Sequence, residues 1–311
     1  MNPATPATNV DTLTHTPAGV TTLVRLVARA LRPHQWLKNL LVFVPAVAAH
    51  RFDPHTIEDV LLAFVVLSCC ASGGYVLNDL IDMASDRLHA RKRHRPFASG
   101  RLSRTTGLVM IGVAWGFGLV GAILLSPAFA LVALLYLATT LLYSTLLKRI
   151  AVLDVMILAG LYVFRVMAGG VATAIPVSSW LLAFTLFVSL SLAFLKRFIE
   201  VRAVAATEST HVPGRGYRVD DAGWLHSAGL SSAYLGVLVL ALYATSADVT
   251  RLYTHPERLL VTCPVVLYWA TRTWLLAHRG ELHDDPVVAV AFDPVTYVVL
   301  GLSGLTVLLS I

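Results

Sequence analysis

The chain has 311 residues, of which 57% are hydrophobic and only 14% are Asp, Glu, Lys or Arg. Soluble domains are about 45–50% apolar and about 25% charged, so this composition excludes an ordinary soluble domain and predicts a polytopic membrane protein. The three cysteines include the adjacent Cys69 and Cys70 inside an apolar run, which argues against a disulfide framework. The net charge of +6 does not predict nucleic-acid binding, because in a membrane protein the positions of the cations matter more than their sum.

Residues 1–22 are rich in Thr, Pro and Ala, and we expect a disordered tail there, followed by one catalytic transmembrane domain over residues 23–311. The first apolar segment of that domain is the weakest, because its continuous apolar part is short and contains Pro45. Most of the other segments are close to the ~20 residues that cross a bilayer. The sequence therefore predicts an all-α fold with nine transmembrane helices, at 37–50, 60–77, 107–125, 128–147, 151–172, 177–195, 228–247, 259–277 and 294–311.

The basic residues predict the orientation of these helices. Most Lys and Arg side chains precede the first segment or fall in the second, fourth, sixth and eighth loops, whereas Arg51, Arg251 and Arg258 fall on the other side. The positive-inside rule then places the N-terminus in the cytoplasm and the C-terminus outside. The long, charged loops at 78–106 and 196–227 are both cytoplasmic, and functional residues concentrate in such loops.

An acidic motif begins the first long loop, with Asn78, Asp79, Asp82 and Asp86. If the preceding helix continues, the three carboxylates share one face and repel one another unless a cation lies between them. Oxygen ligands suit Mg²⁺, which binds one or two protein carboxylates together with water and substrate phosphate. We therefore expect Asp79, Asp82 and Asp86 to be catalytic and, with Asn78, to bind the metal ion. The alternative is a loop whose acids only pair with the basic residues that follow, which are Arg87, Arg91, Lys92, Arg93 and Arg95.

Two further charges lie within the predicted fifth helix. Asp154 and Arg165 are eleven residues apart, close to three helical turns, so they face the same way with Tyr162 beside them. A charge at the bilayer centre is costly, so we expect Arg165 to contact a phosphate or a buried partner, the alternative being a salt bridge to another helix. Asp154 either supports the site or stabilises the helix N-terminus. Lys148 is a phosphate candidate, or else an ordinary positive-inside residue.

The acidic motif resembles the signature of the UbiA superfamily of intramembrane prenyltransferases. Three other stretches share this resemblance: Arg32 to Asn39, Arg93 to Gly100, and Tyr143-Ser144 with Lys148 and Asp154. The resemblance implies nine helices around a central cavity that opens to the cytoplasm, with Mg²⁺ bound at the acidic motif and a diphosphate bound to the metal.

The second long loop departs from the aromatic prenyltransferases of that superfamily, because it lacks their second acidic motif. It carries Lys196, Arg197, Glu200 and Arg202, followed by Arg215-Gly216-Tyr217, and the eighth loop carries Asp284-Asp285. These features resemble the branch that makes decaprenylphosphoryl 5-phosphoribose. The resemblance implies Mg²⁺-dependent transfer of phosphoribose from phosphoribosyl pyrophosphate (PRPP) to a polyprenyl phosphate, in a bacterial cytoplasmic membrane, for arabinan cell-wall precursors.

The expected partners are therefore PRPP, a polyprenyl phosphate and the bilayer, with no nucleic acid, and the oligomeric state stays open. Asp284, Asp285 and Asp293 either assist the site or cap helices beside prolines. Two alternatives remain, an aromatic prenyltransferase that uses a prenyl diphosphate and a non-enzymatic transporter. The residues expected to bind substrate phosphates are Lys38, Arg87, Lys92, Arg95, Tyr143, Lys148, Arg165, Lys196, Arg197, Arg202 and Arg215, supported by Asp154, Glu200 and Tyr217.

Overall fold

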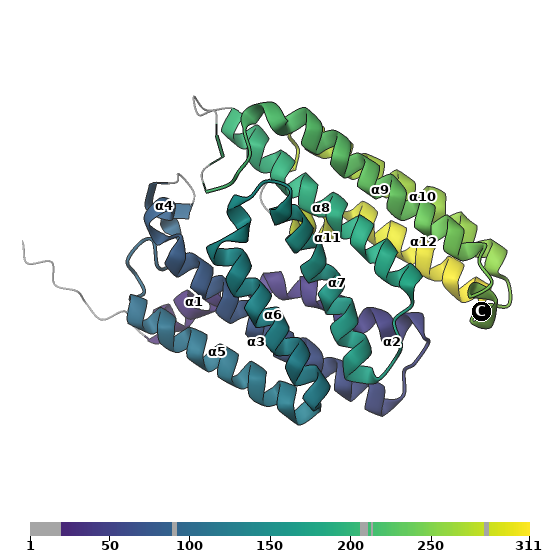
Figure 1. Cartoon of the computed structure of the whole chain (residues 1–311), viewed down its shortest axis with the longest axis horizontal. Helices are drawn as coiled ribbons and strands as arrows, with labels where there is room; N and C mark the ends of the chain where they lie inside the picture. Colours follow the sequence, from purple (N-terminus) through teal and green to yellow (C-terminus); the bar gives the residue numbers. More distant parts are fainter. Residues whose placement is uncertain (1–19, 89–91, 206–210, 213, 283–285) are drawn as a thin grey trace, which may run out of the picture.

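The computed structural model describes residues 20–88, 92–205, 211–212, 214–282 and 286–311, which form an all-helical bundle (Figure 1). Within these ranges the only β-type pairing is an isolated bridge between His211 and Arg218. In chain order the α-helices are α1 (Val20–Leu31), α2 (Val44–Ala48), α3 (Pro54–Ile81), α4 (Met83–Leu88), α5 (Arg104–Leu125), α6 (Pro127–Thr145), α7 (Leu153–Thr173), α8 (Ser179–Ala205), α9 (Ala222–Ala244), α10 (Thr262–His278), α11 (Pro286–Ala291) and α12 (Pro294–Ser310). The 3₁₀ helices are η1 (Pro33–Phe43), η2 (Lys92–His94), η3 (Leu147–Arg149), η4 (Val219–Asp221), η5 (Val249–Arg251) and η6 (Pro256–Val261).

Seven helical segments of the described chain are long and apolar enough to cross a membrane. They are α3, α5, α6, α7, α8, η4 with α9, and η6 with α10. Helix α12 is apolar but only 17 residues long. The predicted first span, 37–50, is not a continuous α-helix, because the chain there forms η1 and then the five-residue α2, which contains Pro45. The structure thus supports a multi-pass helical membrane protein, with seven long spans where nine were predicted.

Capping residues explain where several helices begin. Asp53 accepts a hydrogen bond from the backbone N–H of Thr56 (3.1 Å) at the start of α3, and Ser126 does the same for Phe129 (3.0 Å) at the start of α6. Asp293 caps α12 and pairs with Arg272, so its cap role is the one observed. Helix α1 begins at Val20, inside the segment expected to be disordered, and residues 1–19 lie outside the described chain.

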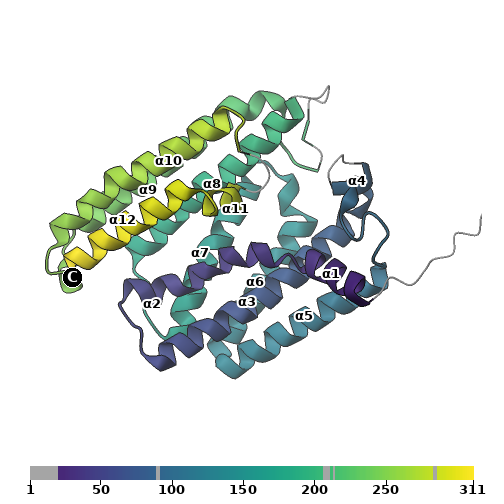
Figure 2. The ribbon, with the colours of Figure 1, turned by 180° about the vertical axis from the view of Figure 1, so that it is seen from behind.

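The helices pack in two groups. One is centred on α3, which contacts α5, α6, α7 and η1, and the other on α8, which contacts α9 and α7. Figures 1 and 2 show α5 along one edge of the bundle and α9 and α10 along the opposite edge, with α7 and α8 between them. Helix association in lipid depends on close van der Waals packing, for which small residues are suited. At Gly169 an added Cβ atom would lie 2.0 Å from the carbonyl oxygen of Val42, so η1 crosses directly over α7.

The weakly apolar η1 is held by polar contacts. Trp36 Nε1 donates to Ser72 Oγ (2.9 Å) and Asn39 Nδ2 donates to Ser68 Oγ (3.1 Å), both serines belonging to α3. Arg165 Nε on α7 donates to Asn39 Oδ1 (2.8 Å). Polar groups inside a bilayer must be satisfied within the protein, and these contacts satisfy the side chains of Trp36 and Asn39.

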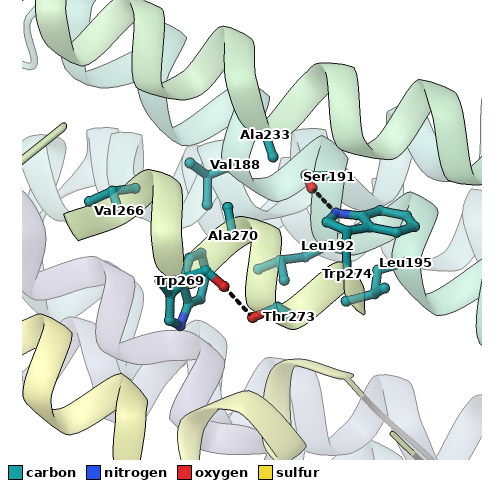
Figure 3. A pocket seen from close by; sticks show the side chains of 10 residues that line it. All are labelled: Val188, Ser191, Leu192, Leu195, Ala233, Val266, Trp269, Ala270, Thr273 and Trp274. Atoms are coloured by element: carbon teal, nitrogen blue, oxygen red, sulfur yellow. Dashed lines mark hydrogen bonds between the residues drawn. The ribbon is translucent and has the colours of Figure 1, made fainter. Parts of the chain in front are cut away.

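Two pockets lie away from these polar contacts. One, between α8, α9 and α10, has a volume of about 10 Å³ and is too small for a substrate; in it Trp274 Nε1 donates to Ser191 Oγ (3.0 Å) (Figure 3). The other is an open apolar groove of about 420 Å³ where α7 connects to α8, lined by residues such as Met167 and Ile175. Neither pocket contains the charged residues that the sequence singled out.

Candidate active site

The acidic motif lies across the junction of α3 and α4. Asn78 and Asp79 lie in the last turn of α3, Asp82 is its C-cap residue, and Asp86 lies on α4. The helix extends past the predicted end at residue 77 but does not continue through the whole motif, because α3 ends at Ile81. The backbone N–H of Asp82 still donates to Asn78 O (2.9 Å) and that of Asp86 to Asp82 O (2.8 Å). Helical spacing persists across the break, and the carboxylates stay on one side of it.

Two arginines neutralise the buried pair Asp79 and Asp86, which are 2% and 3% exposed. Arg95 Nη1 lies 3.2 Å from Asp79 Oδ1 and 2.7 Å from Asp86 Oδ2, so one guanidinium bridges both carboxylates. Arg32 Nη2 lies 2.6 Å from Asp79 Oδ1. Arg32 was not among the predicted site residues; its adjacent Pro33, which breaks the chain direction after α1, is the signal in the sequence. Its backbone is left-handed, with φ 54°, and this turn directs the side chain to Asp79.

Lys148 contacts the other half of the motif. Its Nζ atom lies 2.7 and 2.9 Å from the two carboxylate oxygens of Asp82 and 3.1 Å from Asn78 Oδ1. Lys148 is 5% exposed and belongs to η3, the turn between α6 and α7. Three oxygen atoms thus already converge on one positive charge, as the expected sharing of one face by Asn78 and Asp82 requires.

A second polar centre lies around Arg197 of α8. Its Nε donates to Asp154, its Nη1 to Glu200, and its Nη2 to Tyr143 OH (3.0 Å). Arg197 is 1% exposed, and every nitrogen of its guanidinium donates to a protein group. This arrangement differs from the expected direct role at a phosphate. Arg215 Nη1 donates to Tyr143 OH (3.2 Å) and to the carbonyl oxygen of Lys148 (3.3 Å). Lys148 therefore links the second centre to the acidic motif.

Tyr217 closes the base of this second centre. Its hydroxyl donates to Asp154 Oδ1 (2.6 Å) and accepts from the backbone N–H of Val152 (2.9 Å). Burial and the hydrogen bond to Asp154 raise the pKa of Tyr217 above its ordinary value, so the hydroxyl stays protonated. Asp154 is fully buried, and its two oxygens accept hydrogen bonds from Arg197 and Tyr217. It therefore supports the second centre in addition to lying at the N-terminus of α7.

Lys92 belongs to η2, in the loop that follows the acidic motif. Although much of Lys92 is exposed, desolvation of its ammonium group lowers its pKa, which the charges of Glu200 and Asp86 oppose and those of Arg95 and Arg215 reinforce. The charges that act on Lys92 thus come from both centres. The start of α9 and helix α4 also lie at the same end of the bundle, opposite the C-terminus (Figure 1).

Other predicted phosphate ligands lie elsewhere. Arg165 donates to Asn39, to Leu161 O (2.5 Å) and to Tyr136 OH (2.9 Å), and it lies 5.4 Å from the Tyr162 ring centroid. The structure thus gives Arg165 buried partners that are all neutral, and none of them is the carboxylate of a salt bridge.

The remaining basic residues lie at the acidic motif, on η1 and on α8. Arg87 Nε donates to Ala98 O (3.1 Å), which fixes the loop after the acidic motif. Arg202 lies over the Phe198 ring at 5.8 Å. Lys38 is half-buried on η1, whereas Lys196 is half-buried on α8 and its charge acts on Glu200. Arg91, Asp284 and Asp285 lie outside the described residues.

Within the described part of the chain, no three Asp, Glu, His or Cys side chains are close enough to hold a metal ion by themselves. Mg²⁺ does not require three, because it takes one or two protein carboxylates and completes its shell with water and substrate phosphate. The oxygen atoms of Asn78 and Asp82 that converge on Lys148 are of the type that this ion prefers. The residues present therefore fit a magnesium–diphosphate complex.

Comparison with known proteins adds a family match. The profile of the UbiA prenyltransferase family matches residues 39–292, which is most of the chain. The uncharacterized protein y4nM of Sinorhizobium fredii is 39% identical over 269 residues, 86% of this chain but only 52% of that protein. The nodulation protein NoeC of Azorhizobium caulinodans is 37% identical over 278 residues, covering 88% of this chain and 90% of that protein.

The chain is also similar to a relative with a named activity and, in its fold, to a different protein whose structure is solved. The decaprenyl-phosphate phosphoribosyltransferase of Mycobacterium tuberculosis is 39% identical over 202 residues, covering 63% of this chain and 66% of that enzyme. Among solved structures, a UbiA homolog from Archaeoglobus fulgidus bound to GPP and Mg²⁺ superposes with a TM-score of 0.68 at 15% identity, covering 91% of this chain and 99% of that one. At that identity the likeness establishes a shared fold.

Proposed function

Because this chain belongs to the UbiA prenyltransferase family and is a transferase, we propose that it transfers 5-phosphoribose from PRPP to a polyprenyl phosphate such as decaprenyl phosphate. The observation that carries the proposal is the arrangement of charge. The acidic motif around Asp82 faces a basic centre that contains Arg215 and Lys196, and Lys148 contacts both. The relatives named decaprenyl-phosphate phosphoribosyltransferase support the same reaction.

The acidic motif is the proposed site of the PRPP diphosphate. Asn78, Asp82 and Asp86 would hold Mg²⁺, which when bound supplies positive charge to the leaving diphosphate. Lys148 and Arg95, which now contact the carboxylates, lie where they can also donate to diphosphate oxygens. These residues position the leaving group and stabilise the charge that develops on it.

The basic centre is the proposed site of the acceptor phosphate. Arg215, Lys196 and Lys92 supply cations there. Arg197 donates hydrogen bonds to Tyr143 and Glu200 and so fixes their positions. In the reaction the bond between ribose C1 and the diphosphate oxygen breaks, and a lipid phosphate oxygen forms the new bond to C1 from the opposite face. The phosphate oxygen is already ionised at neutral pH, so no protein base has to remove a proton, and catalysis consists of positioning and charge stabilisation.

The proposal includes nine membrane crossings, with the N-terminus and the site at the cytoplasmic face of a bacterial inner membrane and the C-terminus outside. At about 2.0 Å per residue in a 3₁₀ helix and 1.5 Å in an α-helix, η1 and α2 together extend about 30 Å, the thickness of the hydrocarbon core. They are therefore long enough to serve as the first crossing, and α12 extends about 26 Å as the last. In this setting the product serves as a precursor for arabinan of the cell wall.

The test is transfer of label from ribose-labelled PRPP into organic-extractable lipid by proteoliposomes that contain decaprenyl phosphate. We expect labelled lipid only when Mg²⁺ is present. Asp86→Asn should lower the rate at least 100-fold, whereas Asp59→Asn, near the opposite end of α3, should not change it. No product from folded protein, with product formed instead from a labelled prenyl diphosphate and an aromatic acceptor, would replace this proposal by prenyl transfer.

A further inference from the structure

The Arg215-Gly216-Tyr217 motif packs against the turn that connects α6 to α7. Val212 N–H donates to the carbonyl oxygen of Tyr217 (3.1 Å), and an antiparallel bridge joins His211 to Arg218, so the motif lies in a tight reversal of the chain. Val212 and Tyr217 are 7% and 2% exposed. The motif is therefore held in place by buried residues of its own loop, and it packs against the turn between α6 and α7.

Each of the three residues contacts this turn. Arg215 donates to the carbonyl oxygen of Lys148 (3.3 Å). A Cβ atom on Gly216 would lie 2.7 Å from both Arg149 O and Ala151 N, so only glycine permits this approach of the two backbones. The Tyr217 hydroxyl accepts a hydrogen bond from the backbone N–H of Val152 (2.9 Å). Three successive residues thus hold residues 148–152.

Val152 has a backbone conformation that is unfavourable for its residue type. Its φ is 68° and its ψ is −50°, and Leu153 N–H donates to Ala151 O (2.8 Å) across it. This is a γ-turn with positive φ, which is rare and strained, and a β-branched residue makes it more so. Val152 is 40% exposed, so packing of its side chain does not impose the conformation. The support comes from the backbone N–H, which is bound by Tyr217.

The Tyr217 hydroxyl is itself anchored. It donates to Asp154 Oδ1 (2.6 Å), and the other oxygen of Asp154 accepts from Arg197. Asp154 and Arg197 are 0% and 1% exposed. A hydroxyl that is oriented by a buried ion pair can hold the strained turn in one position.

We propose that Tyr217 is a positioning residue that holds the strained turn at Val152 and thereby keeps Lys148 directed at Asn78 and Asp82. The inference rests on the proposed function in one respect, that Lys148 acts at the site of the diphosphate. It gives the Arg-Gly-Tyr motif a mechanical role that is distinct from binding the acceptor phosphate. The motif connects the long loop after α8 to the acidic motif through the backbone of one turn.

The test begins with Tyr217→Phe, which keeps the ring and removes the hydroxyl. We expect kcat for PRPP to fall about tenfold or more with KM changed less than threefold, because Lys148 loses its direction without loss of the substrate site. Tyr234→Phe on α9, whose hydroxyl contacts Thr271 (3.3 Å), is the matched control and should behave as the wild type. Gly216→Ala should lower kcat as Tyr217→Phe does, whereas Gly223→Ala, whose added Cβ meets open space, should not.

The decisive variant is the double change Val152→Gly with Tyr217→Phe. Glycine adopts positive φ without strain, so the turn no longer needs the hydroxyl, and kcat should return to within threefold of the wild-type value. A residue that only stabilises the fold would not be rescued in this way. A double variant as slow as Tyr217→Phe, or slower, would overturn the proposal.

Hydrogen exchange gives a readout that does not depend on turnover. In Tyr217→Phe the amide of Val152 loses its acceptor, so the peptide containing residues 150–154 should exchange faster than in the wild type and in Tyr234→Phe. Equal exchange in all three proteins would refute the proposed role of Tyr217 in holding the turn at Val152. If the wild type transfers no phosphoribose but the exchange difference is present, the proposed function fails while the structural role of Tyr217 stands.

Discussion

Replacing Lys148 with methionine removes the cation that contacts both Asn78 and Asp82. Methionine has a similar length and is apolar, so the turn between α6 and α7 keeps its packing. Asp82 then faces the proposed metal position with its full negative charge. We therefore expect Mg²⁺ alone to bind more tightly, while PRPP turnover falls because the leaving diphosphate has lost a donor.

The size of both effects follows from the contact. Two unit charges about 4 Å apart interact by about 4 kcal/mol at an effective dielectric constant of about 20. The Asp82 side chain is 30% exposed, and solvent screening reduces the interaction to about a third, or ~1.4 kcal/mol, which is a tenfold change in binding constant. Loss of one preorganised donor at a developing anion costs about 10²–10³ in kcat.

The assay is calorimetric titration of Mg²⁺ into the protein in lipid nanodiscs, paired with the PRPP turnover rate of the same preparation. Arg149→Met, at the exposed neighbouring residue, is the control and should change neither quantity. Tighter metal binding with slower turnover is the expected result for Lys148→Met. Unchanged or weaker metal binding would show that the lysine does not share its oxygen ligands with the metal, and unchanged turnover would remove it from the site.

Two further predictions concern Arg165 and Lys92. Arg165→Lys should lower the thermal midpoint by several degrees and leave KM for PRPP unchanged, because lysine cannot make the three directed hydrogen bonds of the guanidinium; an unchanged midpoint with a raised KM would place Arg165 at a phosphate instead. The pKa of Lys92 is lowered from 10.5, so as pH rises its charge is lost earlier than that of an ordinary lysine. Turnover should therefore fall on the alkaline side, and Lys92→Arg, which stays charged, should move that fall to higher pH; an identical profile would exclude Lys92 from anion binding.

The long apolar helices were predictable from the sequence because length and hydropathy alone determine whether a helix can cross a bilayer. Seven predicted segments, from 60–77 to 259–277, coincide with long helices of the structure. The segment 37–50 was not predictable in form. Pro33 begins η1 and Pro45 lies in α2, and η1 is held by hydrogen bonds to Ser68 and Ser72 of α3. Hydropathy contains no information about such distant hydrogen bonds.

The candidate site was predictable in its residue types but not in its pairings. The spacing of Asp79, Asp82 and Asp86 indicated convergence, yet it did not indicate that Arg32 would be a partner, since that contact joins residues 47 positions apart. Charge alone also made Arg197 and Arg165 appear equivalent to Arg215. Burial separates them, because Arg197 and Arg165 are 1% and 5% exposed and have their nitrogens bound within the protein.

The polar contacts of η1 have a consequence for how the chain enters the membrane during synthesis. Asn39 accepts a hydrogen bond from Arg165, a residue that is synthesised 126 positions later in the chain. The translocon sorts segments largely by hydropathy, and η1 contains Gln35, Lys38 and Asn39, so it lacks the apolar length to remain in lipid alone. We expect its stable insertion to follow the arrival of α3 and α7, which makes membrane assembly of this protein dependent on folding and not only on the order of synthesis.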